Sequence, residues 1–350
     1  CTFAVLTATY LQEMFSLVGM EVGSFEFFLI CAALIIIFAI INILGIEVIS
    51  NMATVVTFLC FIPFIIMVIC AFMHMEDPAS MVTPLKHDDM SFLQSAGQGL
   101  LIGIWFNQGY ETISCASGDI ENGERVVPRG ILISIPIIAL MYMLWVVPAV
   151  GAINEMQPGS WANWGTGEGN ITFVVACEIL GGAPLKWAMV AAGSLASMMI
   201  LCEYIMAYAH VMSSFSKKGT FFEIFSRESK SKGTPVAAII IISAVSTALS
   251  LWAAYSQGED SPFQILVEVA TAIYAIPCCL VFISNMKMRI KEPDKKLAFK
   301  VPLPNKLYCI WLCVPIILYI YSIVSDIAIS GIGILLGLTA IPAYIFFKKI

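Results

Sequence analysis

The chain has 350 residues, of which 59% are hydrophobic and only 12% are charged, and its formal net charge is −6. Its mean hydropathy is +0.90. Soluble globular domains are about half apolar and about a quarter charged, so this composition excludes that class and indicates a membrane protein with several spans.

Ten apolar segments approach the length of about 20 residues that a spanning helix needs. The chain starts at Cys1, within an apolar run, so we expect a fragment whose natural N-terminus lies further upstream. The predicted spans are, in chain order, 1–20, 25–45, 50–74, 93–119, 129–152, 184–213, 235–257, 262–286, 308–326 and 328–347.

Basic residues are distributed unequally between the two predicted faces of the membrane. Of the 18 Lys and Arg residues, 16 follow the fourth, sixth and eighth spans or end the chain. The opposite face has only Lys86 and Lys186, together with acidic stretches and the glycosylation sequon at Asn170. Because cytoplasmic loops carry the excess of Lys and Arg, we expect the basic face and the C-terminus to be cytoplasmic.

Few ionisable side chains lie within the predicted spans. An acidic or basic side chain near the centre of a span costs about 2.5–3.5 kcal/mol on insertion scales, so each is by default a functional hypothesis. The set consists of Glu13, Glu111, Glu203, His210 and Glu268.

The segment WFNQGYETIS (105–114) interrupts the fourth predicted span. Asn107, Gln108 and Gly109 favour a break in the helix just before Glu111. A broken membrane helix is tolerated where its backbone faces protein or water, and such breaks form the midplane sites of transporters. A kinked helix whose carboxylate pairs with a neighbour is the alternative.

Glu203 and His210 are seven residues apart and therefore share one face of the sixth predicted span. Met199, Ala196 and Ala192 extend this face, which suits either close helix packing or the lining of a pathway. His210 is closer to the cytoplasmic end, where an interfacial position is the simpler interpretation.

Tyr274 lies in the middle of the eighth predicted span, ahead of Pro277. Its hydroxyl needs a hydrogen-bond partner, and core packing and site lining explain it equally well. Glu268, near the outer end of the same span, and Glu13, in the first span, are weaker candidates for the site.

Motifs of other protein classes are absent. The sequence has no GxxxxGK[ST] phosphate loop, HExxH, GxSxG or TVGYG, and no soluble stretch long enough for a domain. The eleven cysteines form no CxxC pair and no zinc-type cluster, which is typical of packing residues. We therefore expect no enzyme, no catalytic residue, no cofactor, no metal site and no nucleic-acid partner.

Several motifs resemble those of the amino acid–polyamine–organocation (APC) superfamily. WFNQGYETISCASGDIENGERVVPRG (105–130) resembles its sixth-span signature, LAFKVPLP (297–304) the motif ahead of its eleventh span, and NILGIEVISN (42–51) the junction of its fourth and fifth spans. ITFVVACEILGGAPLKW (171–187) resembles the outer short helix of the polyamine-uptake and light-chain-type amino acid transporter branches, to which the similarity is closest.

The resemblance implies an all-α polytopic membrane protein with a five-plus-five inverted repeat, of which this chain holds about ten spans, the family's spans three to twelve. Residues 1–350 would form one transporter domain. Within it, 1–74 would be the end of the first repeat, 93–286 the second repeat, and 308–347 two C-terminal spans.

The resemblance also implies roles for individual residues. Trp105 matches an aromatic residue that covers the substrate, and the run from Asn107 to Tyr110, which includes Gln108 and Gly109, matches the unwound stretch. Glu111 and Glu203 fall where polyamine-uptake members carry acidic residues. We expect substrate to contact these residues and Tyr274.

The coupling ion and partners are less constrained. Ser194 and Ser197, on the span that corresponds to the family's eighth, could ligate sodium, although small hydroxyl residues are common in membrane helices. A titratable Glu111 instead favours a proton. Light-chain relatives use a cysteine in the outer loop after the third span to link a partner subunit. The corresponding loop, GMEVGSF (19–25), has none, so no linked partner is expected.

These features together predict a multi-pass transporter of the plasma membrane that moves amino acids or polyamines. Cationic amines are favoured, and coupling to protons with alternating access is the expected mechanism. A neutral amino acid exchanger of the same family and a nutrient receptor that binds without transport remain alternatives.

Overall fold

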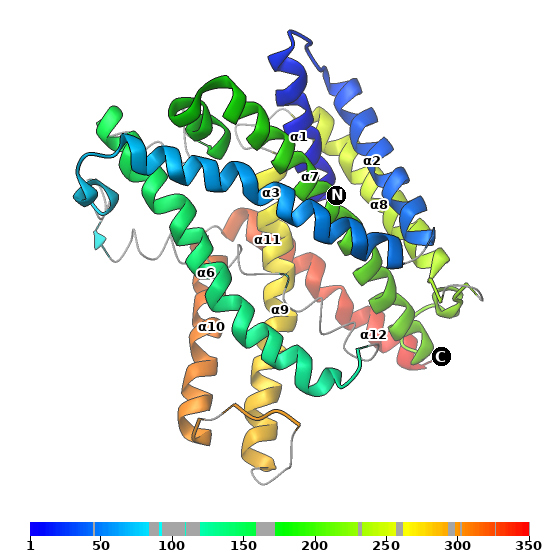
Figure 1. The fold of residues 1–350 in the computed structure, drawn as a ribbon. Coiled ribbons are helices and arrows are strands. Elements are labelled where there is room, and N and C mark those ends of the chain that lie inside the picture. Colours follow the sequence, from blue (N-terminus) through cyan, green and yellow to red (C-terminus); the bar gives the residue numbers. More distant parts are fainter. Residues whose placement is uncertain are drawn as a thin grey trace. The chain divides into compact units, whose positions relative to one another are not determined.

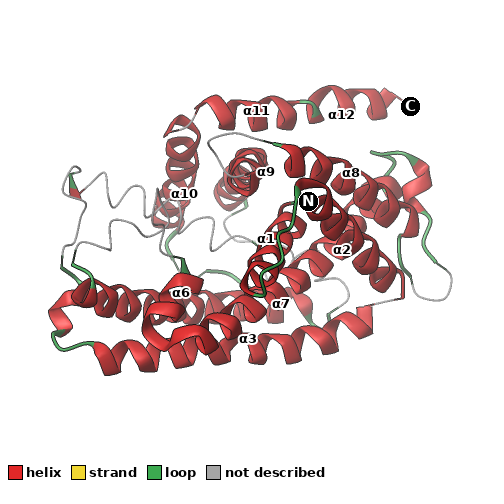
Figure 2. Cartoon of the chain, turned by 90° about the horizontal axis from the view of Figure 1, so that it is seen from above, coloured by secondary structure: helices red, strands yellow, loops and turns green. Residues whose placement is uncertain are grey.

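The computed structural model describes residues 1–44, 46–83, 91–92, 109, 120–158, 172–229, 233–256, 262–292, 298–301, 303–325 and 327–349. Within these ranges all regular secondary structure is helical, which confirms the predicted all-α class (Figures 1 and 2). The α-helices are α1 (Thr2–Leu17), α2 (Ser24–Leu44), α3 (Ile46–His74), α6 (Gly123–Met156), α7 (Phe173–Lys217), α8 (Val236–Tyr255), α9 (Pro262–Lys291), α10 (Asn305–Ser325), α11 (Ile327–Leu338) and α12 (Ala340–Lys349).

Seven stretches of the described helices are long and apolar enough to cross a membrane. They lie in α2, α3, α6, α7, α8 and α9 and across Ser330–Phe347, and α10 adds a shorter apolar stretch. The predicted span 93–119 falls outside the described residues, apart from Gly109. The observed helices match the other predicted spans closely, and the prediction of a multi-pass membrane protein is confirmed.

One predicted boundary is wrong, and one predicted span, although long and apolar enough to cross a membrane, is divided between two helices. The first helix ends at Leu17 rather than residue 20, because Gly19 adopts a φ of 79° and the N–H of Met20 turns back to the carbonyl of Phe15. The predicted span 328–347 is divided into α11 and α12, which follow one another end to end in Figure 2. Pro342 has no N–H to donate to the carbonyl of Leu338, so one continuous helix is disfavoured there.

The chain divides into two compact units, and each is described by itself. The first unit comprises residues 1–96, 133–213 and 224–256, and the second comprises residues 97–132, 214–223 and 257–350. The predicted boundaries of the inverted repeats stay a prediction, since these units group residues by contact and not by internal symmetry.

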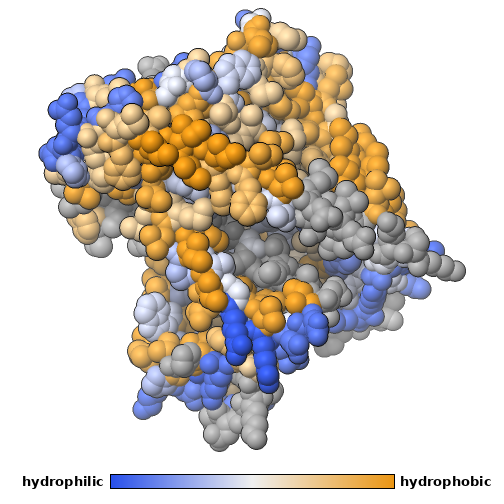
Figure 3. Space-filling view, viewed as in Figure 1, coloured by the Kyte–Doolittle hydropathy of each residue, from blue (hydrophilic) through white to orange (hydrophobic). Residues whose placement is uncertain are grey.

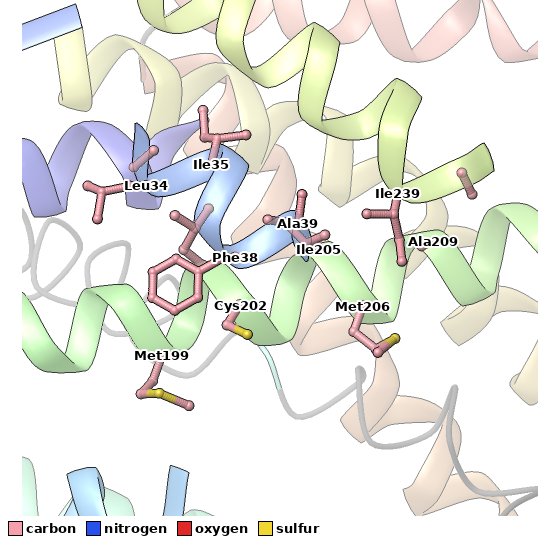
Figure 4. Packing of buried hydrophobic residues seen from close by; sticks show 13 residues of the cluster. Leu34, Ile35, Phe38, Ala39, Met199, Cys202, Ile205, Met206, Ala209 and Ile239 are labelled. Carbon is pink, nitrogen blue, oxygen red and sulfur yellow. The ribbon is translucent and has the colours of Figure 1, made fainter. Parts of the chain in front are cut away.

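In the first unit, α2 lies against α1 and α8 (Figure 1). Figure 4 shows how side chains of α2, α7 and α8 fill the space between them. On α2, Ile35 is fully buried, whereas the neighbouring Ile36 and Ile37 are 54% and 51% exposed. A helix that is apolar on all sides is typical of a membrane span, because one side faces protein and the other faces lipid.

A second packed cluster of the first unit joins α3, α6 and α7. Ala71 of α3, Ala149 and Ala152 of α6, and Ala176 of α7 are fully buried in it. Lipid chains are as apolar as these side chains, so close van der Waals packing holds membrane helices together, and small residues permit that close approach.

In the second unit, α9 packs against both α10 and α11. Gly333 and Gly337 of α11 face α9 so closely that an added Cβ would lie 2.6 Å from the Val269 carbonyl oxygen and 2.7 Å from Ile276 Cδ1, respectively. This GxxxG pair lets the two backbones approach, as small residues do at other membrane helix interfaces.

Candidate functional site

Most residues of the predicted site lie outside the described part of the chain. This is the case for Trp105, Asn107, Gln108, Tyr110 and Glu111. Within the segment 105–111 the described residue is Gly109, which lies in a turn with a φ of 111°. That value is far from the helical region and favours glycine, so the backbone is not α-helical at this residue.

Helix α7 has a break of its own near its N-terminal end. Gly182 has φ 70° and ψ −170°, a conformation that is essentially restricted to glycine. Two residues later, Pro184 removes a further helical hydrogen bond. The segment Phe173–Lys217 therefore consists of a short helix followed by a long one. This agrees with the predicted short helix ahead of the span at 184–213.

Glu203 lies on the long part of α7 with its side chain exposed. Within the described part of the chain its carboxylate has no hydrogen bond or ion pair. Its neighbour Cys202 is buried in the cluster that α7 forms with α2 and α8. A carboxylate on a membrane helix requires water or a polar partner, so the exposed position of Glu203 suits a polar pathway better than a lipid-facing surface.

The face of α7 on which the sequence predicts Glu203 and His210 is buried at some residues and exposed at others. Met199 is 7% exposed and packs into the core with α2, and Ala192 is 5% exposed, whereas Glu203 is exposed. His210 is half-buried two turns further on, a rise of about 10 Å. At that separation a direct Glu203–His210 pair is not formed.

Tyr274, the other predicted site residue, is half-buried on α9 in the second unit. Its ring lies 6.5 Å from the ring of Tyr319 of α10, in an edge-to-face arrangement. This contact is helix packing of the kind that aromatic pairs favour.

A small hydroxyl cluster links α1 to α7. Thr7 Oγ1 lies 2.8 Å from Ser197 Oγ, and Ser197 Oγ also lies 2.8 Å from the Gly193 carbonyl, to which it donates. Ser194 Oγ donates to the Val190 carbonyl at 2.9 Å. The two serines for which sodium ligation was considered thus bond to their own helix, as is common for buried Ser in membrane helices.

A buried amide links α2 to α7 close to Glu203. Asn42 is fully buried, and its Nδ2 donates to the carbonyls of Phe38 at 2.7 Å and Cys202 at 3.1 Å. Asn42 is not among the site residues predicted from the sequence. A lone amide in an otherwise apolar span was the signal that could have found it.

An ionic cluster at the break in α7 was likewise missed. Lys186 Nζ lies 2.8 Å from Glu178 Oε2 and 3.7 Å from Glu13 Oε1 of α1. The Lys186 side chain is only 14% exposed, whereas the two carboxylates are almost half exposed. Glu13 is therefore part of an ion-pair cluster at the end of the helices. Lys186 itself was counted only for topology.

No group of three or more His, Cys, Asp or Glu side chains among the described residues could hold a metal ion. On and around α7, the hydroxyls of Ser194 and Ser197 and the amide of Asn42 are buried in helix packing, whereas the Glu203 carboxylate is exposed. A carboxylate can bind an amine by hydrogen bonding and charge.

Comparisons with known proteins give a consistent picture. The model of the family described as amino acid permease matches residues 1–346. An Arabidopsis thaliana protein named a probable polyamine transporter is 22% identical over 306 residues, which cover 87% of this chain and 57% of that protein. A polyamine transporter of Oryza sativa subsp. japonica is 21% identical over 319 residues, or 89% of this chain and 55% of that protein.

A bacterial protein is also similar. The cadaverine/lysine antiporter of Escherichia coli (strain K12) is 24% identical over 223 residues, which cover 63% of this chain and 48% of that protein. The chain thus spans about half the length of the curated relatives that it matches.

Proposed function

Because the chain belongs to the amino acid permease family, we propose that the protein is a secondary active transporter of amino acids or polyamines that works by alternating access. The family is a transporter family, which supports this function over an enzymatic one. Relatives named polyamine transporters and a cadaverine/lysine antiporter support substrates with more than one amine.

The observation that carries the choice of a cationic substrate is the position of Glu203. It lies 17 residues after Lys186 and 14 residues before Lys217, so it is about 25 Å from the first and about 21 Å from the second along α7. That is close to the middle of a bilayer, where a carboxylate with no partner among the described residues attracts an ammonium group strongly.

In this mechanism Glu203 and Glu111 contact the amines of the substrate. Trp105 covers the substrate, Gly109 and its neighbours Asn107, Gln108 and Tyr110 offer backbone groups, and Tyr274 lines the path. Protonation of one carboxylate weakens its hold on the amine, which couples release to the proton gradient. The protein would act in the plasma membrane with its basic loops and its C-terminus in the cytoplasm.

The decisive experiment is uptake of radiolabelled putrescine, arginine and leucine into proteoliposomes, with and without an imposed pH gradient. Replacing Glu203 by Gln removes one charge-assisted hydrogen bond worth about 1.5–3 kcal/mol, so the KM for putrescine should rise about 10- to 100-fold. Glu111→Gln should act in the same direction. The matched control is Glu21→Gln, in the loop between α1 and α2, which should transport like the parent.

The outcomes separate the competing functions. Uptake of leucine alone, unchanged by Glu203→Gln, would instead identify a neutral amino acid exchanger. Binding of putrescine without accumulation would identify a receptor. If a protonophore leaves putrescine uptake unchanged, the proposal of proton coupling is wrong. The proposal of a cationic substrate is not affected by that result.

A further inference from the structure

The second unit contains a cavity of about 540 Å³ at the end of α9 that precedes the basic connection to α10. It is lined by the last turns of α9, by Phe299–Val301 and by Tyr308 near the start of α10. The volume lies within the range of about 300–1,000 Å³ that small-ligand sites occupy. None of its lining residues belongs to the proposed transport site.

Arg289 holds the wall of this cavity in place. Its side chain is largely buried, with the residue only 8% exposed, and Nε donates to Asn305 Oδ1 at 2.8 Å. One terminal nitrogen donates to the carbonyls of Val301 at 2.9 Å and Leu303 at 3.1 Å. The guanidinium also lies 4.5 Å above the ring of Tyr308, a cation–π contact. Val301 and Leu303 are thereby held against α9.

The lining changes character along α9. At one end are the apolar side chains of Leu280 and Val281, which are 59% and 60% exposed. One to three turns further on, the polar side chains of Ser284, Asn285 and Arg289 join the lining beside Met288, and Tyr308 donates to Asn285 Oδ1 at 3.1 Å. A ligand that fits both ends must itself be amphiphilic.

The charge around the polar end is positive. The described residues between 287 and 306 include five basic side chains and one acidic one, Glu292. Two of the basic residues, Arg289 and Lys300, line the cavity beside Glu292, so the lining itself carries a net charge of +1. Hydrophilic residues gather at the bottom of the view in Figure 3, where α9 ends and α10 begins in Figure 1. Basic clusters of about 4–8 residues next to a membrane span attract anionic lipid headgroups.

We propose that this cavity binds an anionic phospholipid of the leaflet on the basic side, with its phosphate near Arg289 and Lys300 and an acyl chain along Leu280 and Val281. Because Arg289 holds Val301 in the wall, this part of the site is preformed, and binding does not have to order it first. This site is independent of the proposed transport function, because its residues and its ligand differ from those of transport.

The test is native mass spectrometry of the purified full chain, equilibrated with equal amounts of phosphatidylglycerol and phosphatidylcholine. The parent should retain phosphatidylglycerol in preference by at least about tenfold, since Arg289 and Lys300 near the headgroup each contribute a factor of about five. Lys300→Glu reverses one charge of the lining and should abolish the preference. Lys218→Glu, an exposed lysine at the end of α7, should keep it.

A second variant tests the apolar end without any change in charge. Val281→Trp fills the cavity from its exposed side and should reduce the retention of phosphatidylglycerol about tenfold or more, while the unfolding temperature in pure phosphatidylcholine stays that of the parent. If Lys300→Glu and Val281→Trp both retain phosphatidylglycerol like the parent, the proposal is wrong. Displacement of the lipid by millimolar inorganic phosphate would also overturn it, because the site would then take a free anion.

Discussion

Lys186 Nζ lies 2.8 Å from Glu178 Oε2, and the two residues are on opposite sides of the break at Gly182. The ion pair joins the short helix of α7 to the long one, and the second carboxylate, Glu13, joins both to α1 at 3.7 Å. Lys186 therefore helps to hold the short helix in place, in addition to the packing of its buried residues Val174, Cys177 and Leu180.

We expect Lys186→Gln to lower the free energy of unfolding by about 1 kcal/mol, the upper end for partly exposed ion pairs. The measurement is thermal unfolding in nanodiscs. The difference from the parent should shrink in 1 M salt, because the Debye length falls to about 3 Å. Lys218→Gln, at an exposed position, is the control and should lie within about 0.5 kcal/mol of the parent. Equal stability of Lys186→Gln and parent at low salt would show that the cluster contributes nothing.

Gly182→Ala should destabilise the protein by about 1–3 kcal/mol. The cause is backbone strain, because a Cβ at this position would meet only Pro184 Cδ, at an ordinary 3.8 Å. Gly130→Ala is the control: it lies inside α6 with open space around it and should gain up to about 1 kcal/mol. If the Gly182→Ala variant has the same unfolding temperature as the parent, the break in α7 does not need a positive φ at this residue.

Asn42→Leu should cost about 0.6–1.7 kcal/mol, the range for one hydrogen bond between membrane helices. Asn42→Asp should cost more at neutral pH, about 2.5–3.5 kcal/mol, because a buried carboxylate would face the Cys202 carbonyl instead of donating to it. Protonation restores a donor, so the aspartate variant should recover stability as the pH falls. Unfolding curves across pH 4–8 test this, and a pH-independent loss equal to that of Asn42→Leu would contradict it.

Gly333→Ala should destabilise the packing of α11 on α9 by about 1–3 kcal/mol, since the added Cβ would lie 2.6 Å from the Val269 carbonyl oxygen and 2.7 Å from the Ala272 Cβ. Backbone atoms cannot move aside as a flexible side chain can. Gly331→Ala, two residues away on the same helix, meets nothing within 4 Å and should be neutral or slightly stabilising. Thermal unfolding of the two alanine variants is the measurement, and the prediction fails if they are equally stable.

The length of the apolar runs and their lack of charged residues predicted most of the fold. The reason is that a single segment within a bilayer can satisfy its backbone hydrogen bonds only as an α-helix. Helices such as α2 and α8 therefore begin and end within a few residues of the predicted bounds. The division between α11 and α12 was not predicted, because it depends on a proline and not on the length of the apolar run. A single proline within an apolar run kinks some membrane helices and ends others, and the packing of neighbours decides which.

The sequence by itself determined that this is a multi-pass member of a transporter family, because composition and motif spacing are local properties of the chain. It also marked Glu203 as a costly charge within a span. Only the tertiary structure decided that Glu203 is exposed while Met199, one turn earlier, is buried, and that Ser194 and Ser197 bond to their own helix. The contacts of Lys186 and Arg289 likewise depend on residues that are distant in sequence, and long-range packing of that kind leaves no periodic pattern along the chain.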